Sequence, residues 1–270
     1  MNVKFWQVDS FTTQAFKGNP AGVCVTEAPL PSDVMQCIAA EMNLSETAFA
    51  LPGDTEGDFL LRWFTPVKEV RLCGHATLAT AGVLYDYFGN KGKELRFHTL
   101  SGVLKTQYRD GRIEMDFPLC LPKPLSLSEE TIESLALPAF REIRYSEELK
   151  KLLFVLTNEE DVKRYEPDFE NWKRIKFPIE VIGIILTAES AGEYDFVSRF
   201  FAPWLGINED PVTGSSHTIL GPYWREKHGK KSFRAFQCSK RGGELFLTVE
   251  AERVRIEGRY IFVLEGVLSI

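Results

Sequence analysis

Two short stretches of the chain combine side chains that can bind an anion or take part in proton transfer. The first, RLCGHAT, places Cys73, Gly74 and His75 directly before an almost wholly apolar run. The second, DPVTGSSH, begins at Asp210 and carries a threonine, a glycine and a serine at positions 213–215. Thiol, imidazole, carboxyl and hydroxyl groups donate or accept protons, and glycine lets a ligand approach the backbone without a Cβ in the way.

Both stretches are predicted to begin helices. The first turn of a helix has backbone N–H groups without partners and about half a unit of positive charge, so it binds anions. We expect the backbone at Gly74, His75, Gly214 and Ser215 to hold the carboxylate of a small substrate. The same dipoles would stabilise negative charge that grows beside that carboxylate, as when a proton leaves carbon.

The segments around the two stretches follow one plan. Each half contains strands, one long helix and a hairpin, with period-two alternation and turn signals such as RDG. A constant offset of 140 residues relates four positions of the first half to four of the second: Cys73 to Thr213, Gly74 to Gly214, Gly89 to Gly229 and Gly102 to Gly242. The sequence therefore predicts an internal duplication, with Cys73 and Thr213 at equivalent positions among the substrate-binding residues.

The helix of the first half, HATLATAGVLYDYF, has no broad polar face, which is typical of a helix enclosed on all sides. Its small side chains would let a sheet wrap closely around it. We predict an α+β fold of two pseudo-symmetric halves, 1–118 and 119–270, each a mostly antiparallel, barrel-like sheet around a central helix. The C-terminal segment can cross back into the first half. Both helix starts would then point into a cleft between the halves.

Two other segments carry local predictions. The stretch SDVMQCIAAEMN is expected to form a helix with Ser32 as its N-cap. The region 120–180 contains LPKPLSLSEE and YEPDFENWKR, and we expect it to hold the crossover between the halves and short surface helices.

Composition narrows the class of protein. The 270 residues are 44% hydrophobic and 26% charged with a formal net charge of -6, which argues against a nucleic-acid partner. The longest buried-looking run, VIGIILTA, is too short to span a membrane. Five cysteines without a CxxC pair, and an N-terminus that begins as a strand, favour a cytoplasmic protein. Neither a metal-ligand pattern nor a glycine-rich nucleotide motif is present, so we expect no metal and no cofactor.

Five motifs in order resemble the phenazine-biosynthesis isomerase-like (PhzF) family: GNPAGVCV, NLSETAF, RWFTPVKEVRLCGHAT, RFFAPWLGINEDPVTGSSH and QCSKRGGEL. The last motif is similar to the MAWD-binding-protein-like branch. The resemblance covers nearly the whole chain and implies the diaminopimelate-epimerase fold. It also implies an isomerase of the type that moves a proton on a dihydro-hydroxyanthranilate without metal or organic cofactor. Relatives tend to be dimers, so a homodimer is expected by analogy.

The resemblance also assigns roles to individual residues. Glu46 in SETAF matches the family's catalytic glutamate, and its apolar neighbours Ala48 and Phe49 would desolvate its carboxyl group. His75 would orient the substrate or relay a proton. Asp210, in the pattern EDPVTG, would hold His75 or the substrate.

Cys73 helps to distinguish between the types of reaction that enzymes of this fold carry out. Its racemases and epimerases place two thiols on either side of one carbon, but the offset puts Thr213 where the second thiol should be. A threonine hydroxyl is too weak an acid to replace a thiolate. A dehydratase therefore stays open as an alternative, as does a binding protein with a relic cleft. Cys73 itself is either a chemical group or a small packing residue.

Overall fold

The computed structural model describes residues 2–270 as a mixed α+β chain with many strands and few helices. The chain divides into two compact units: unit 1 holds residues 2–117 and 255–270, and unit 2 holds residues 118–254. Most strand pairs are antiparallel. The exceptions are β2 with β3, β4 with β6, β11 with β12, and β13 with β15. No helix of residues 2–270 is long and apolar enough to cross a membrane.

Unit 1 is a sheet whose two ends are joined by the end of the chain. Its strands pair in the order β1-β2-β3-β4-β6-β7-β8, while β17 pairs with β8 and β18 pairs with β1. Because β17 and β18 follow one another directly, they connect the two ends of this ladder. The strands are β1 (Asn2–Ser10), β2 (Asn19–Val25), β3 (Glu46–Pro52), β4 (Asp58–Phe64), β5 (Glu69–Val70), β6 (Glu94–Thr99), β7 (Gly102–Arg109), β8 (Arg112–Pro118), β17 (Arg253–Gly258) and β18 (Tyr260–Ser269).

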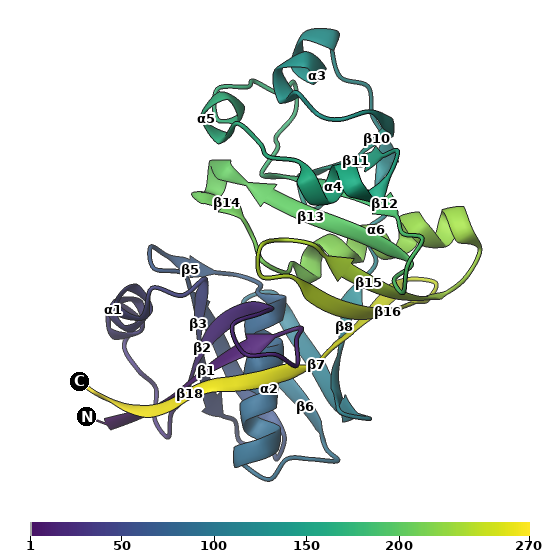
Figure 1. The fold of residues 1–270 in the computed structure, drawn as a ribbon. Coiled ribbons are helices and arrows are strands. Elements are labelled where there is room, and N and C mark those ends of the chain that lie inside the picture. The colour runs from purple at the N-terminus through teal and green to yellow at the C-terminus, as the bar shows by residue number, and fades with distance from the viewer. Residues whose placement is uncertain (1) are drawn as a thin grey trace. The chain divides into compact units, whose positions relative to one another are not determined.

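The long helix of unit 1, α2 (Gly74–Tyr87), lies inside this sheet (Figure 1). Every residue from His75 to Tyr85 is buried, and the helix contacts β1, β2, β3, β7 and β18. The close fit requires small residues: a Cβ on Gly82 would lie 2.8 Å from the ring of Tyr260. The apolar run therefore folds as the enclosed helix that its sequence predicts.

The short helix α1 (Ser32–Met42) corrects one local prediction. Its N-cap is Pro31, with φ -59° and ψ 145°, and no side chain caps the first turn. Ser32 is the first helical residue, and its hydroxyl accepts a hydrogen bond from Arg62 at 3.0 Å. The proline ring fixes φ at this boundary, and the helix begins one residue earlier than a cap at Ser32 would place it.

Unit 2 repeats the order of pairing seen in unit 1. β10-β11 is antiparallel, β11-β12 parallel, β12-β13 antiparallel, β13-β15 parallel and β15-β16 antiparallel. The long helix α6 (Gly214–His228) is buried along most of its length and contacts β16. The remaining elements are β9 (Lys123–Pro124), α3 (Glu129–Leu135), β10 (Phe140–Ser146), β11 (Lys151–Leu156), α4 (Glu159–Arg164), α5 (Phe169–Trp172), β12 (Gly183–Glu189), β13 (Phe196–Ala202), a 3-10 turn (Pro203–Leu205), β14 (Ile207–Glu209), β15 (Ser232–Gln237) and β16 (Gly243–Val249).

The region 120–180 is more than a crossover with surface helices. The short helices α3, α4 and α5 are present, but β10 and β11 also lie here, and every residue of β11 is buried. β11 contributes Leu152, Phe154 and Leu156 to a core that Trp172 of α5 completes. The prolines in the neighbouring segments led the sequence analysis to overlook β10 and β11, which lie at the centre of unit 2.

Candidate active site

The first candidate site lies where strands and the long helix of unit 1 meet. Glu46 is the first residue of β3 and pairs with Ala21 of the parallel strand β2. Because parallel strands run in the same direction, the starts of β2 and β3 lie at the same edge. Asn19 opens β2 opposite Ser10, the last residue of β1, and the Ser10 hydroxyl donates to the His75 carbonyl at 2.8 Å. These contacts fix the start of α2 beside Glu46.

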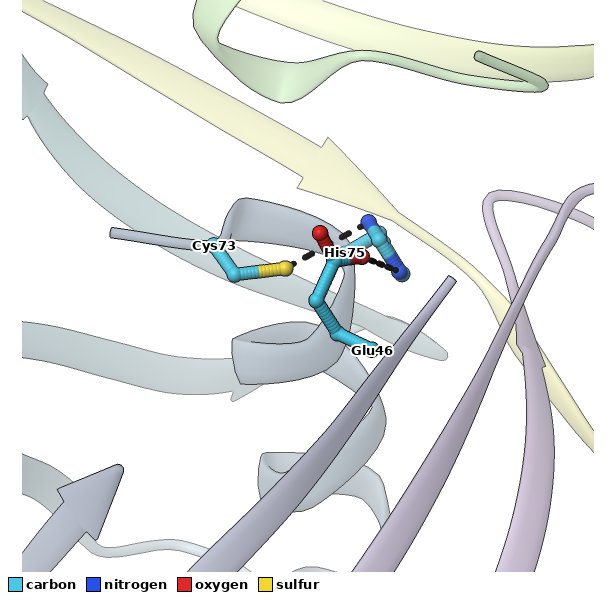
Figure 2. A group of neighbouring side chains, drawn as sticks. All are labelled: Glu46, Cys73 and His75. Atoms are coloured by element: carbon cyan, nitrogen blue, oxygen red, sulfur yellow. Dashed lines mark hydrogen bonds and ion pairs between the residues drawn. The ribbon is translucent and has the colours of Figure 1, made fainter. Parts of the chain in front are cut away.

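Three side chains contact the imidazole of His75, and Figure 2 shows two of them, Glu46 and Cys73. Glu46 Oε2 lies 3.1 Å from His75 Nε2, and the two side chains are 13% and 7% exposed. On the other side of the ring, Cys73 Sγ lies 3.5 Å from Nδ1, and Asn19 Nδ2 lies 3.2 Å from the same nitrogen. The carboxylate of Glu46 and the thiol of Cys73 thus lie against different nitrogens of one buried ring.

The contact between Glu46 and His75 is close but poorly aligned. Among residues 2–270, Nε2 has no partner that meets the directional requirement of a hydrogen bond, although the carboxylate is 3.1 Å away. Asn19 Nδ2 can donate to Nδ1 only while the ring is neutral and carries its proton on Nε2, whereas an imidazolium would require the amide oxygen of Asn19 at this place. Misaligned hydrogen bonds of this kind are common in unliganded catalytic sites and tighten when substrate binds.

Charge in this cluster favours an imidazolium. Burial lowers the pKa of His75, but the electrostatic interactions and hydrogen bonds with Cys73 and Glu46 outweigh burial and raise the pKa above 6.5. Burial raises the pKa of the Cys73 thiol to about 11, with Glu46 adding to the effect. Cys73 is therefore a neutral thiol at pH 7, and the Glu46 carboxylate is the charge that acts on His75.

The starts of α2 and α6 have the same backbone form. Cys73 precedes α2 with φ -145° and ψ 108°, and Thr213 precedes α6 with φ -113° and ψ 99°. Neither N-cap side chain, Cys73 or Thr213, forms a hydrogen bond to the first turn of its helix. Each start therefore presents the uncapped backbone donors that an anion requires.

Around the start of α6 the side chains bond to one another. The Thr213 hydroxyl donates to the Asp210 carboxylate, and the Thr213 N–H donates to Gln237 Oε1 at 2.9 Å. Gln237 Nε2 in turn donates to the Asp210 carbonyl at 2.8 Å. The amide of one buried glutamine thus fixes both Asp210 and Thr213.

The model of the phenazine biosynthesis-like protein family matches residues 8–266 of the sequence. The chain belongs to this PhzF family. A bovine phenazine biosynthesis-like domain-containing protein is 45% identical over 289 residues, which cover 100% of both chains. An uncharacterized isomerase of Pseudomonas aeruginosa is 44% identical and covers 98% of each chain. The crystal structure of a PhzF family protein from Enterococcus faecalis is 41% identical, with a TM-score of 0.93 and full coverage of both chains.

A more distant neighbour confirms the fold class. A hydroxyproline epimerase from Agrobacterium vitis, solved with bound trans-4-hydroxy-L-proline, has a TM-score of 0.61 at 12% identity and covers 99% of this chain and 92% of its own. At this identity the likeness concerns the fold alone, which is diaminopimelate-epimerase-like as predicted. Membership of the family, with a relative named as an isomerase, supports an isomerase of this fold.

The predicted site residues of this PhzF-family chain fall into two groups. Glu46, Cys73 and His75 lie together beside Gly74 in unit 1. The second group lies at the start of α6 in unit 2 and consists of Asp210, Thr213, Gly214 and Ser215. Within unit 1 the acidic partner of His75 is Glu46, while the carboxylate of Asp210 accepts a hydrogen bond from Thr213.

Two residues of the PhzF-family chain escaped the sequence analysis. Asn19, which contacts His75, stands in the motif GNPAGVCV, but nothing in that string marks it as a partner of an imidazole 56 residues away. Lys151 places its amine at the start of α6. The burial of Lys151 could have been predicted from the sequence. Lys151 directly precedes the apolar stretch LLFVL, and a lysine in that place is buried when the stretch forms a central strand.

The cluster in unit 1 contains residue types that bind metals. One ligand atom from each of Glu46, Cys73 and His75 lies within 4.8 Å of the others. An imidazole offers one nitrogen to a given ion, however, and the thiol and the carboxylate lie against different nitrogens. A single ion could reach all three only after the side chains rearrange, so the arrangement suits proton transfer better than metal coordination.

Proposed function

We propose that this protein is a cofactor-independent isomerase that moves a proton on carbon of a small carboxylate-bearing metabolite. Glu46 is the general acid/base in this proposal, and His75 orients the substrate and balances charge. The contact between Glu46 and His75 is the observation that supports it most. Membership of a family whose relatives include a named isomerase adds to it.

The chemistry follows from the charges of the cluster. The Glu46 carboxylate takes a proton from a carbon next to an electron-withdrawing group, and the electron pair left behind spreads into that group. The imidazolium of His75 and the uncapped N–H groups at the start of α2 stabilise the resulting negative charge. Glu46 then returns its proton to a different carbon, which completes an isomerisation with no change in composition.

In unit 2, Asp210, Gly214 and Ser215 are proposed to bind the carboxylate and polar groups of the substrate. The resemblance to PhzF proteins is what assigns both groups of residues to one reaction. The start of α6 supports the carboxylate role, because the side chain of its N-cap residue, Thr213, forms no hydrogen bond to the first turn. Thr213 lies at the same start, with its hydroxyl on Asp210.

A two-thiol epimerase is the weaker alternative. Cys73 is a buried thiol whose pKa is raised to about 11, and the Thr213 hydroxyl is committed to a carboxylate. Neither residue offers the thiolate that this chemistry needs. Dehydration stays open, since Glu46 can deliver its proton to a leaving group instead of carbon. So does a binding protein that has lost turnover.

Exchange of carbon-bound hydrogen in D2O tests the proposal. A panel of cyclic carboxylic acids and amino acids is incubated with the protein, and deuterium incorporation is followed by NMR and mass spectrometry. Glu46→Gln should slow exchange on any responding compound by roughly two to four orders of magnitude. Glu41→Gln, an exposed acid on α1, is the matched control and should exchange like wild type.

Three other outcomes would each contradict a part of this proposal. Unchanged exchange in Glu46→Gln removes that residue from the chemistry. Loss of water from the responding compound identifies a dehydratase. Thermal stabilisation by a compound that never exchanges identifies a binder.

A further inference from the structure

A buried amine lies at the start of α6. Lys151, the first residue of β11, is only 5% exposed. Its Nζ donates to Ser215 Oγ at 2.7 Å and lies 3.4 Å from Ser216 Oγ. The ring of Phe200 covers another side of the amine, with Nζ 4.2 Å from the ring centre. The amine therefore ends on the first turn of the helix, surrounded by neutral groups.

No carboxylate neutralises this amine directly. Among residues 2–270, Lys151 forms no ion pair, and Asp210 acts on it only from a longer distance. Burial lowers the pKa of Lys151 to about 8, and the opposing charge of Asp210 offsets only part of this effect. The amine is thus mostly protonated at pH 7, and a buried cation without a counter-charge is costly. A fold that keeps such a group is suited to an anion.

The surrounding strands hold the amine in place. Lys151 pairs with Gly183 of β12, and a Cβ on that glycine would lie 2.4 Å from the ring of Phe200. The glycine therefore makes room for the aromatic ring that lies against Nζ. Strands β11, β12 and β13 together fix the charge at this point.

The hydrogen bond from Lys151 also sets the direction of the Ser215 hydroxyl. Since Ser215 Oγ accepts from the ammonium, its own proton must point away from Nζ. Ser215 is half-buried, whereas Lys151 is buried, so the serine is the more accessible member of this pair. The hydroxyl is thus prepared to donate to an incoming acceptor, next to the uncapped N–H groups of α6.

We propose that Lys151 is a positioning residue for anion recognition: it supplies the positive charge behind Ser215 and orients that hydroxyl to bind an organic carboxylate at the start of α6. The inference rests on the proposed function, because the ligand it implies is the carboxylate of that substrate. It goes further by making the recognition depend on a residue of β11. Ser215 touches the ligand, and Lys151 acts through it.

The test uses the whole protein with simple probes. Acetate and benzoate, with acetamide and benzamide as neutral counterparts, are titrated against protein labelled in lysine side chains. The Lys151 resonance is assigned by its loss in Lys151→Met. The carboxylates should shift this resonance saturably while the amides and equal concentrations of sodium chloride do not. The resonance of Lys163, which is paired with Glu159 and Glu160 on α4, should stay in place.

The affinity for benzoate provides a readout that a purely structural role would not move. Wild type should lose affinity as the pH rises from about 7 to about 9, because the Lys151 amine loses its proton near pH 8. Cys120 and His217, with pKa values raised to about 11 and lowered to about 4, keep one charge state over this interval. Lys151→Met should bind roughly tenfold to a hundredfold more weakly at pH 7, with a flat pH profile. Lys163→Met should match wild type.

The inference is overturned when neither carboxylate shifts the Lys151 resonance, when the amides shift it equally, or when Lys151→Met retains wild-type affinity and pH dependence. Glu46→Gln separates this inference from the proposed function. A silent Lys151 together with loss of exchange in Glu46→Gln rejects only the role of Lys151. A responsive Lys151 together with unchanged exchange in Glu46→Gln rejects only the acid/base role of Glu46.

Discussion

The starts of α2 and α6 share a backbone design but carry different chemistry. Each follows an extended residue, begins at a glycine and lacks a side-chain cap. At α2 the neighbours are an imidazole, a thiol and a carboxylate, all of which can take up or release a proton. At α6 they are hydroxyl groups backed by an ammonium. The backbone provides a general receptor for anions, and the side chains decide whether that receptor moves protons or only binds.

The strands ahead of these helices show a similar contrast. Arg62 of β4 pairs with Glu69, and Arg199 of β13 pairs with Glu209, each with Nε 2.7 Å from a carboxylate oxygen. The arginine side chain is 34% exposed in the first pair and 6% exposed in the second. Arg199 also donates to the carbonyls of Val162 and Tyr165. The same ion pair is a partly solvated contact in unit 1 and a buried junction in unit 2.

Removing these arginines should give the largest contrast between the units. Arg199→Leu leaves Glu209 and backbone carbonyls buried without donors, so it should cost about 3–5 kcal/mol of unfolding free energy. Arg62→Leu should cost about 0–1 kcal/mol, because water replaces the lost partner. Urea denaturation of both variants measures the difference. Equal losses would mean that the exposure of the arginine does not control the strength of the pair.

Lys151→Met should change stability in the opposite direction. Below about pH 8 the folded and unfolded chains both hold the Lys151 proton, and the cost of burying the charge is present in full. Between pH 8 and the ordinary value of 10.5, the unfolded chain binds more protons, so wild-type stability rises with pH. Lys151→Met should therefore be more stable than wild type at pH 7, by at most about 3 kcal/mol. The gap should close near pH 10.5 in urea titrations.

His75 sharpens this comparison because its pKa moves the other way. The pKa of His75 is raised above 6.5 in the folded state, so protonated His75 adds stability in full below pH 6.5. This contribution is lost as the pH rises through the folded-state pKa.

A lower stability of Lys151→Met than of wild type at pH 7 would contradict the account of Lys151. It would show that Ser215 and Ser216 already compensate its charge.

The sequence predicted the parts of the molecule that depend on local pattern. The starts of α2 and α6 were predictable because in each a small or polar residue, Cys73 or Thr213, is followed by a glycine and then by a long stretch without strand or turn signals. The hairpin of β7 and β8 was predictable from RDG, where Asp110 and Gly111 adopt positive φ. In both cases the residues that decide the structure are neighbours in sequence.

The rest of the site depends on pairings that a sequence does not display. Asn19 reaches His75 only because β2 runs parallel to β3 and beside β1. Lys150 and Lys151 are adjacent and identical in type, yet Lys150 takes a left-handed turn with φ 51° while Lys151 enters a buried strand. The residue at which β11 begins its pairing with β12 thus determines which of the two lysines is buried.

The smallest expected contrast concerns what holds each helix start in place. Gln237 bonds to the Thr213 N–H and the Asp210 carbonyl, whereas at α2 the Ser10 hydroxyl donates one bond to the His75 carbonyl. Gln237→Ala leaves a buried donor and a buried acceptor unsatisfied and should cost about 1–3 kcal/mol, against about 1 kcal/mol for Ser10→Ala. Amide hydrogen exchange at Thr213 should accelerate in Gln237→Ala and stay protected in Gln237→Glu, which keeps the acceptor. If Gln237→Ala left Thr213 protected, the two bonds of that glutamine would not be what fixes the start of α6.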